Sequence, residues 1–201
     1  MGKMIKDAVS LLIITMVAGI FLGLVHEITL EPIAEQKRLT EQRSCQEVFA
    51  DADSFEEKTE VLDACAAAMA AEGYTVQSIT KVMTAKAASG ETLGYVLSVV
   101  DPEGYGGNIG FMLGVRMDGT VNGISILSIN ETAGLGMNAD KPEFKNQFAD
   151  KKVENFVYTK TGAVKENEID AISGATFTTN AVTNGVNAGL AAFRYLAGEE
   201  G

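Results

Sequence analysis

The segment 170–179, DAISGATFTT, carries the side chains of this sequence that are best suited to hold a ligand. Beyond it, apolar residues recur every three or four positions from Val182 onward, which predicts an amphipathic helix that runs to about Leu196. The start of a helix presents unpaired N–H groups and the positive end of the helix dipole, so a phosphate is stabilised there without a basic side chain. The segment therefore predicts a phosphate site, with a simple helix cap as the alternative. The residues concerned are Ser173, Gly174, Ala175, Thr176 and Thr178.

A second segment, 130–137, has the sequence NETAGLGM and follows a predicted strand. A glycine on each side of a leucine allows the backbone to bend closely around a flat ligand. The residues that would contact such a ligand are Glu131, Thr132, Leu135 and Gly136. A simple glycine turn is the alternative interpretation.

The composition argues against several other kinds of chemistry. The single histidine, His26, follows an apolar run, so a Ser-His-Asp or Cys-His catalytic set is not expected. Cys45 and Cys65 lack the CxxC spacing and cannot complete a four-ligand metal site. The glycine-rich run 104–110 does not have the dinucleotide-binding spacing, and there is no GK[ST] phosphate loop. A formal net charge of −11 makes nucleic acid a poor partner.

An apolar run at residues 8–26 predicts a membrane-spanning helix, because about eighteen residues without a charge approach the minimum length for a span. Lys3 and Lys6 precede the run, which favours residues 1–7 in the cytoplasm and the rest of the chain outside it. A cleavable signal peptide is the rival interpretation. The length of the run and the lack of a small-x-small site directly after it argue against cleavage.

Residues 27–72 are expected to form a helical stalk and packing segment between the span and the rest of the chain. Pro32 near the start of a polar stretch predicts that a new helix begins there and runs to about residue 49. A second helix is expected over 54–71. Cys45 and Cys65 lie on these segments, where they are either bridged by a disulfide, which is permitted outside the cytoplasm, or buried as two thiols.

The remaining residues, 73–201, are expected to form one domain of the α+β class. From Tyr74 the apolar residues follow a period of two, which is typical of strands. Four strands in an antiparallel sheet are expected at about 76–82, 93–100, 109–115 and 121–129, with a glycine-rich loop at 101–107 and a tight hairpin turn at 117–119. A short helix at 142–148 and strands near 156–158 and 169–172 complete the pattern, so helices flank the sheet.

Three motifs together with the N-terminal span resemble the FMN-binding domain family found in Rnf and Na⁺-translocating NADH:quinone reductase complexes. The motifs are GYGG at 104–107, ETAGLG at 131–136 and DAISGAT at 170–176. The likeness is greatest to the G subunit of the Rnf complex, and the C subunit of the quinone reductase ranks second because it is usually longer. One departure is Ala133, where relatives commonly have proline before Gly-Leu-Gly.

The resemblance implies that Thr176, the last residue of its motif, is joined to the phosphate of FMN by a flavin transferase. Ser173 and Thr178 would add hydrogen bonds to that phosphate. Asp170 belongs to the same motif. The flavin ring would lie against Leu135 and the other residues of the second segment, namely Glu131, Thr132 and Gly136.

The family further implies an electron-carrier subunit between ferredoxin and NAD⁺, in a complex that moves Na⁺ or H⁺. The expected partners are membrane and peripheral subunits of the complex, the flavin transferase and membrane lipid. The expected location is the bacterial cytoplasmic membrane, with the FMN domain on the extracytoplasmic side. No catalytic residue and no metal are expected. A stand-alone flavoprotein and a flavin-free anchored module are the alternatives.

Overall fold

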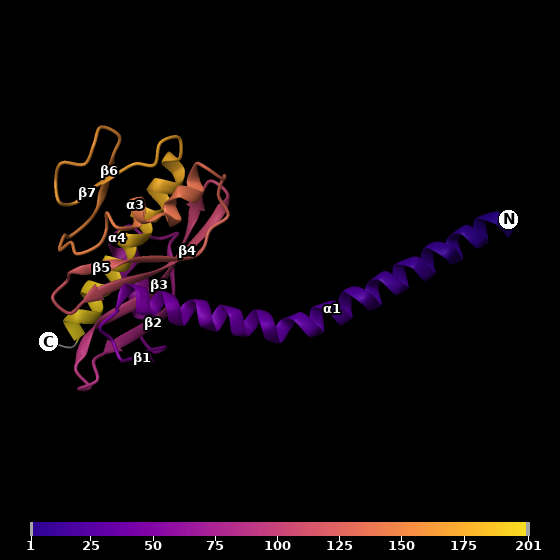
Figure 1. The fold of residues 1–201 in the computed structure, drawn as a ribbon, viewed down its shortest axis with the longest axis horizontal. Helices are drawn as coiled ribbons and strands as arrows, with labels where there is room; N and C mark the ends of the chain where they lie inside the picture. Colours follow the sequence, from indigo (N-terminus) through magenta and orange to yellow (C-terminus); the bar gives the residue numbers. More distant parts are fainter. Residues whose placement is uncertain (1, 200–201) are drawn as a thin grey trace. The chain divides into compact units, whose positions relative to one another are not determined.

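The computed structural model describes residues 2–199, which fall into two compact units, one up to Glu41 and one from Gln42 onward. The first unit is the greater part of the helix α1 (Gly2–Val48), which Figure 1 draws as one continuous element. This helix includes a segment long and apolar enough to cross a membrane. The expectation of a new helix at Pro32 is wrong, because Pro32 lies inside α1. Proline removes one hydrogen bond and bends a helix, but good helix formers on both sides allow it to continue.

The second unit is built on a five-stranded sheet whose order is β1-β2-β3-β4-β5, with every neighbouring pair antiparallel. The strands are β1 (Ser54–Glu57), β2 (Ser78–Lys86), β3 (Thr92–Gly104), β4 (Gly107–Arg116) and β5 (Val121–Ser128). The antiparallel sheet and the α+β class are therefore confirmed. Strands β2 to β5 follow one another as hairpins joined by short connections, whereas β1 and β2 pair across a longer connection that contains α2.

Predicted and observed boundaries differ at β1 and at the β3–β4 hairpin. The helix expected over 54–71 is wrong in its first half, because residues 54–57 pair with the far end of β2 and only α2 (Leu62–Ala71) is helical. Phe55, for example, lies opposite Ala85. The loop expected over 101–107 is mostly strand, because β3 and β4 continue until Gly104 pairs with Gly107 across a two-residue turn. A partner strand supplies hydrogen bonds that local sequence patterns do not reveal.

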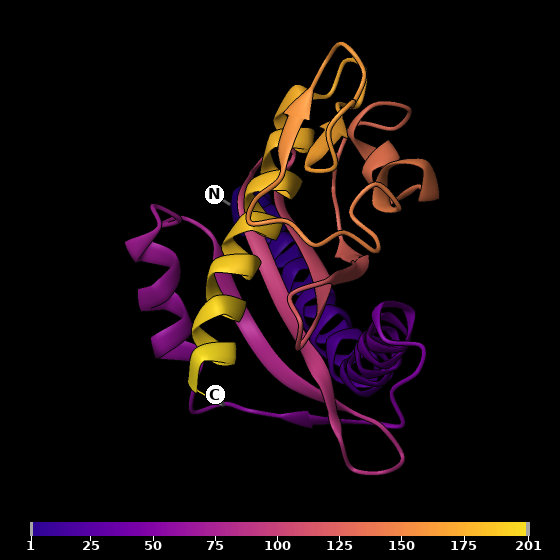
Figure 2. The same cartoon turned by 90° about the vertical axis from the view of Figure 1, so that its left-hand side faces the viewer.

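Both faces of the sheet are buried. On one face the long helix α4 (Thr176–Glu199) and the shorter α2 pack together, as Figure 2 shows with α4 in yellow lying along the strands. Val182, Val186 and Leu190 belong to the buried stripe of α4, which confirms the predicted amphipathic helix. On the other face the last turn of α1 and Phe49 form a smaller apolar cluster with the sheet. Because successive side chains of a strand point to opposite faces of the sheet, the strands contribute to two separate cores.

The cysteines are buried thiols in different cores. Cys45 belongs to the cluster beside α1, where its Sγ lies 3.9 Å from Met83 Sδ. Cys65 belongs to the cluster beside α4. Of the two alternatives for these residues, burial as thiols is the one observed.

The chain between β5 and α4 forms one end of the domain. It contains a 3-10 helix, η1 (Gly136–Asp140), the short helix α3 (Pro142–Lys145), and two parallel strands, β6 (Val157–Thr159) and β7 (Glu168–Asp170). The helix expected over 142–148 is thus shorter than predicted. This end of the domain brings together the two segments that the sequence predicts to bind a ligand.

Candidate functional site

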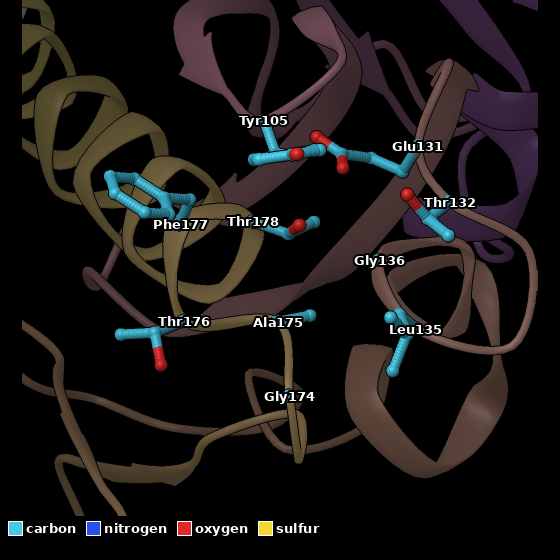
Figure 3. Close-up of a pocket in the computed structure, with 10 residues that line it drawn as sticks. All are labelled: Tyr105, Glu131, Thr132, Leu135, Gly136, Gly174, Ala175, Thr176, Phe177 and Thr178. Carbon is cyan, nitrogen blue, oxygen red and sulfur yellow. The ribbon is translucent and has the colours of Figure 1, made fainter.

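A pocket of about 510 Å³ lies where the β3–β4 hairpin tip, the segment after β5 and the start of α4 meet (Figure 3). Its volume falls within the range of small-molecule and cofactor sites. The residues that line it are Tyr105, Glu131, Thr132, Leu135, Gly136, Gly174, Ala175, Thr176, Phe177 and Thr178. Eight of these ten are residues predicted from the sequence to bind a cofactor. They come from segments about forty residues apart in the chain.

The start of α4 is shaped by a tight turn. Gly174 has a φ of +75°, a left-handed conformation that favours glycine, and the Ala175 N–H donates to the Ile172 carbonyl at 3.0 Å. The side chain that fastens this turn is Thr179. Its hydroxyl accepts a hydrogen bond from the Ile172 N–H at 3.0 Å and donates to the Ala175 carbonyl at 2.9 Å. Sequence reasoning missed this role, because any hydroxyl in the segment 170–179 is an equally good candidate for it.

The turn leaves the first amides of α4 available to a ligand. The first helical hydrogen bond runs from the Thr179 N–H to the Ala175 carbonyl at 3.0 Å. The N–H groups of Thr176, Phe177 and Thr178 precede it and have no acceptor within the helix. The half-buried Thr176 side chain stands at the same place, so its hydroxyl and these amides together suit a phosphate.

The opposite wall of the pocket is held by Glu131. Its Oε1 accepts a hydrogen bond from the Gly106 N–H at 3.2 Å, which joins the segment after β5 to the hairpin tip. Gly136 fits between Glu131 and Thr178, since a Cβ at position 136 would lie 2.6 Å from Glu131 Oε2 and 2.6 Å from Thr178 Oγ1. No larger residue fits there without moving these side chains.

The Leu135 side chain packs between the segment after β5 and the turn before α4. A Cβ placed on Gly174 would lie 3.0 Å from Leu135 Cδ2, so the leucine side chain reaches the turn before α4. Leu135 is 41% exposed and presents an apolar surface to the pocket. The predicted close approach of backbone and ligand at these glycines is thus matched by the packing.

Two aromatic residues at the pocket were not among the predicted site residues. Tyr105 at the hairpin tip and Phe177 on the first turn of α4 are 74% and 68% exposed. Their ring centroids lie 6.4 Å apart, and both rings lie on the same side of the pocket in Figure 3. The signal was present in the sequence, because each is an aromatic residue inside one of the three motifs or directly after it. Exposed aromatic side chains of this kind commonly mark a binding surface.

Two predicted residues do not line the pocket. Ser173 is exposed on the turn before α4. Asp170 ends β7, where its N–H donates to Gln147 Oε1 at 2.6 Å and its Oδ1 accepts from the Ala163 N–H at 2.5 Å. The structure therefore places Asp170 where it shapes the approach to the turn.

The charge of the site comes from one carboxylate. Among the described residues that line the pocket, Glu131 has the only carboxylate and none is basic. Within residues 2–199, no group of three or more His, Cys, Asp or Glu side chains is arranged to hold a metal ion. A phosphate would thus rely on helix amides and hydroxyls for its stabilisation.

A buried carboxylate lies further down the strand that leads to Tyr105. Asp101 is fully buried, and it accepts hydrogen bonds from Gln77 Nε2 at 2.8 Å and from the Glu103 N–H at 2.8 Å. Burial raises the pKa of Asp101 above its usual value, although these hydrogen bonds act in the opposite direction.

The features of the pocket fit a flavin mononucleotide. Exposed aromatic and leucine side chains provide surfaces for a flat ring, glycines allow close approach, and a helix start with a neighbouring threonine hydroxyl suits the phosphate. Polar groups for the rest of the molecule come from Glu131 and the remaining threonines. Cofactor sites with this mixture of apolar walls and a few polar groups are common.

Comparisons with known proteins agree with this geometry. The FMN-binding domain family matches residues 104–191, which include all three motifs. The G subunit of the proton-translocating ferredoxin:NAD(+) oxidoreductase complex of Clostridium ljungdahlii is 36% identical over 88% of this chain and 84% of its own length. The G subunit of the Na(+)-translocating ferredoxin:NAD(+) oxidoreductase complex of Acetobacterium woodii is 32% identical over 96% of this chain and 92% of its own length.

A solved structure supports the fold. The C subunit of the Na(+)-translocating NADH-quinone reductase from Parabacteroides distasonis is similar with a TM-score of 0.57, at 20% identity, over 84% of this chain and 96% of that chain. At this identity the similarity concerns the fold alone. The family match and the relatives that cover most of the chain show that this chain belongs to the FMN-binding domain family, among the G subunits of ion-translocating ferredoxin:NAD(+) oxidoreductase complexes.

Proposed function

We propose that this chain is the electron-carrier subunit of a membrane-bound ferredoxin:NAD⁺ oxidoreductase and holds FMN through a phosphoester on Thr176. The observation that carries the proposal is the position of the Thr176 side chain, at the edge of the pocket and beside the unpaired amides of α4. Relatives that match nearly the whole chain are named as G subunits of such complexes. The donor and acceptor sites for ferredoxin and NAD⁺ would lie on other subunits.

The residues of the chain act by binding and orienting. Attachment by a flavin transferase would form a bond between Thr176 Oγ1 and phosphorus, with loss of the hydroxyl proton and of the leaving group of the flavin donor. The amides of Phe177 and Thr178 stabilise the charge that stays on the phosphate. Leu135 and the aromatic pair would shield the ring from water. When bound, FMN supplies reversible electron transfer, and no acid or base of the chain is needed for that passage.

Attachment to the membrane would keep the carrier close to its partners. The apolar part of α1 is long enough to span a bilayer, and Lys3 and Lys6 at its start favour an extracytoplasmic domain. Confinement raises the effective concentration of the flavin near its donor and acceptor. The transported ion would move through other subunits of the complex.

The experiment that tests attachment is intact-mass measurement of the full chain after co-expression with a flavin transferase. The wild type should gain the mass of one FMN phosphoester, and Thr176→Ala should stay folded in the membrane without it. Ser173→Ala is the matched control, because Ser173 is an exposed hydroxyl of the same motif outside the pocket lining. Flavin fluorescence of denatured Thr176→Ala protein on a gel would refute the assignment. Co-purification with several membrane subunits tests the complex separately.

A further inference from the structure

One wall of the pocket is formed by the start of η1, at Gly136, and a lysine connects this segment to the end of α1 through ion pairs. Lys145, the last residue of α3, has a side chain that is only 14% exposed. Its Nζ lies 3.0 Å from Glu47 Oε1 on the last turn of α1 and 3.4 Å from Asp140 Oδ1 at the end of η1. A single ammonium therefore joins α1, η1 and α3.

Glu47 is itself held in place. The Ser125 hydroxyl on β5 donates to Glu47 Oε2 at 2.6 Å, and the Ser44 hydroxyl lies 3.1 Å from that of Ser125. Burial raises the pKa of Glu47, but hydrogen bonds from Ser125 and Lys145 outweigh burial and bring that pKa below its usual value. Burial lowers the pKa of Lys145, and its contacts with Glu47 and Asp140 raise that pKa above its usual value. Both groups are therefore charged at neutral pH.

The Lys145 side chain is 14% exposed, whereas its partners Glu47 and Asp140 are 52% and 50% exposed. Exposed pairs contribute little, because water screens them and long side chains lose freedom when they pair. A lysine that is largely withdrawn from water is unfavourable unless acceptors surround it, so Lys145 depends on its two carboxylate partners, although water partly screens both of them. The arrangement around Lys145 thus holds three segments in one defined geometry.

The segment held in this way carries part of the pocket. Gly136, the first residue of η1, packs between Glu131 and Thr178, and Leu135 directly precedes it. A shift of η1 would move Leu135 and Gly136 relative to the start of α4. Glu47 stands on the same continuous helix whose N-terminal part contains the apolar span.

We propose that Lys145 is a positioning residue that fixes the η1 wall of the flavin pocket to the end of α1. Through its contacts with Glu47 and Asp140, Lys145 makes the last turn of α1 and the η1 wall move together. A displacement of the end of α1 is therefore transmitted to the residues beside the flavin. This inference rests on the proposed function, because it assumes that the pocket holds FMN.

The test compares Lys145→Met with Lys141→Met in the full, flavinylated chain. Lys141 is an exposed lysine of the same segment for which the described structure shows no ion pair. Lys145→Met should change the equilibrium constant for flavin reduction by about two-fold or more, the lower end of the range for coupled side chains in contact. It should also alter the visible circular dichroism of the flavin. Lys141→Met should leave both unchanged, and Lys145→Arg, which keeps the charge, should restore most of the wild-type signal.

Glu47→Gln provides a second, nearly isosteric variant if Lys145→Met does not fold. It should shift the potential in the same manner, and the double variant should shift it no further than the larger single change. Amide hydrogen exchange of residues 136–145 should increase in both single variants, a readout that does not require flavin. Wild-type potential, circular dichroism and exchange in folded, flavinylated Lys145→Met or Glu47→Gln would overturn the inference and leave the proposed function intact. Absence of FMN from the wild type would overturn the proposed function instead.

Discussion

Glu131 and Gly106 are joined by a hydrogen bond of 3.2 Å, in which the Gly106 N–H donates to the Glu131 carboxylate. The bond places a negative charge at the wall of the pocket and fixes the hairpin tip that carries Tyr105. The same side chain packs against Gly136 through its second carboxylate oxygen. One residue therefore orders two of the three segments that form the site.

Replacing Glu131 by Gln should raise the reduction potential of the bound flavin. The amide keeps the size of the side chain and an acceptor for the Gly106 N–H, but it removes a negative charge that opposes the arrival of an electron. In a partly exposed pocket the effect should be on the order of 1 kcal/mol. Redox titration of the flavinylated protein measures it. A potential that stays constant or falls would show that the carboxylate does not act on the flavin.

Gly136→Ala should displace the side chains that pack against position 136 in the pocket. The added Cβ would lie 2.6 Å from Glu131 Oε2 and 2.6 Å from Thr178 Oγ1, so both side chains must move. We expect a lower yield of covalent FMN and a destabilisation of about 1–3 kcal/mol, as is usual for overpacking. Intact mass and denaturant unfolding measure the two effects. Gly198→Ala is the control, because a Cβ added at Gly198 would meet no atom within 4 Å; equal behaviour of both variants would contradict the prediction.

Tyr105→Ala and Phe177→Ala should separate cofactor shielding from stability. Both rings are largely exposed, so each substitution should change the free energy of unfolding by no more than about 0.5 kcal/mol. If the rings cover the flavin, its fluorescence should become more sensitive to iodide quenching in either variant. Val164→Ala, which removes an exposed apolar side chain outside the pocket lining, is the control. Unchanged quenching in both aromatic variants would exclude a shielding role.

The effect of Asp101→Asn on the free energy of unfolding, relative to the wild type, should be more favourable at neutral pH than at acid pH. Burial raises the pKa of Asp101 in the folded state, so at a pH between its unfolded and folded pKa the folded protein binds more protons than the unfolded chain. The stability contributed by this residue is thus present below its unfolded pKa and is lost as pH rises through its folded pKa. Asparagine does not titrate. The difference in unfolding free energy, variant minus wild type, should therefore increase from about pH 4 to about pH 7; a difference that decreases over this range would contradict the assignment.

Most of the fold could be predicted because its signals are local. The period of two in the strands and the apolar stripe of α4 each lie within a single element, and the antiparallel pairing of β2 to β5 follows from consecutive strands with short connections. The predictions failed at β1, at Pro32 and at the hairpin tip, and the helix predicted over 142–148 is shorter than expected. At β1 and the tip the outcome depends on pairing with another strand, and at Pro32 it depends on helix formers on both sides of the proline.

Some features of the candidate site could likewise be predicted from the sequence, and others depend on the tertiary structure. The residue types and their order along the chain already determined the hydroxyl cluster before a helix, the glycines around Leu135 and the apolar span, because each is a property of neighbouring residues. Only the tertiary structure decided that Glu131 reaches Gly106, that Thr179 fastens the turn before α4, and that Lys145 meets Glu47. Two of these contacts, Glu131–Gly106 and Lys145–Glu47, join residues from distant parts of the chain, and their geometry exists only once the sheet has brought those parts together.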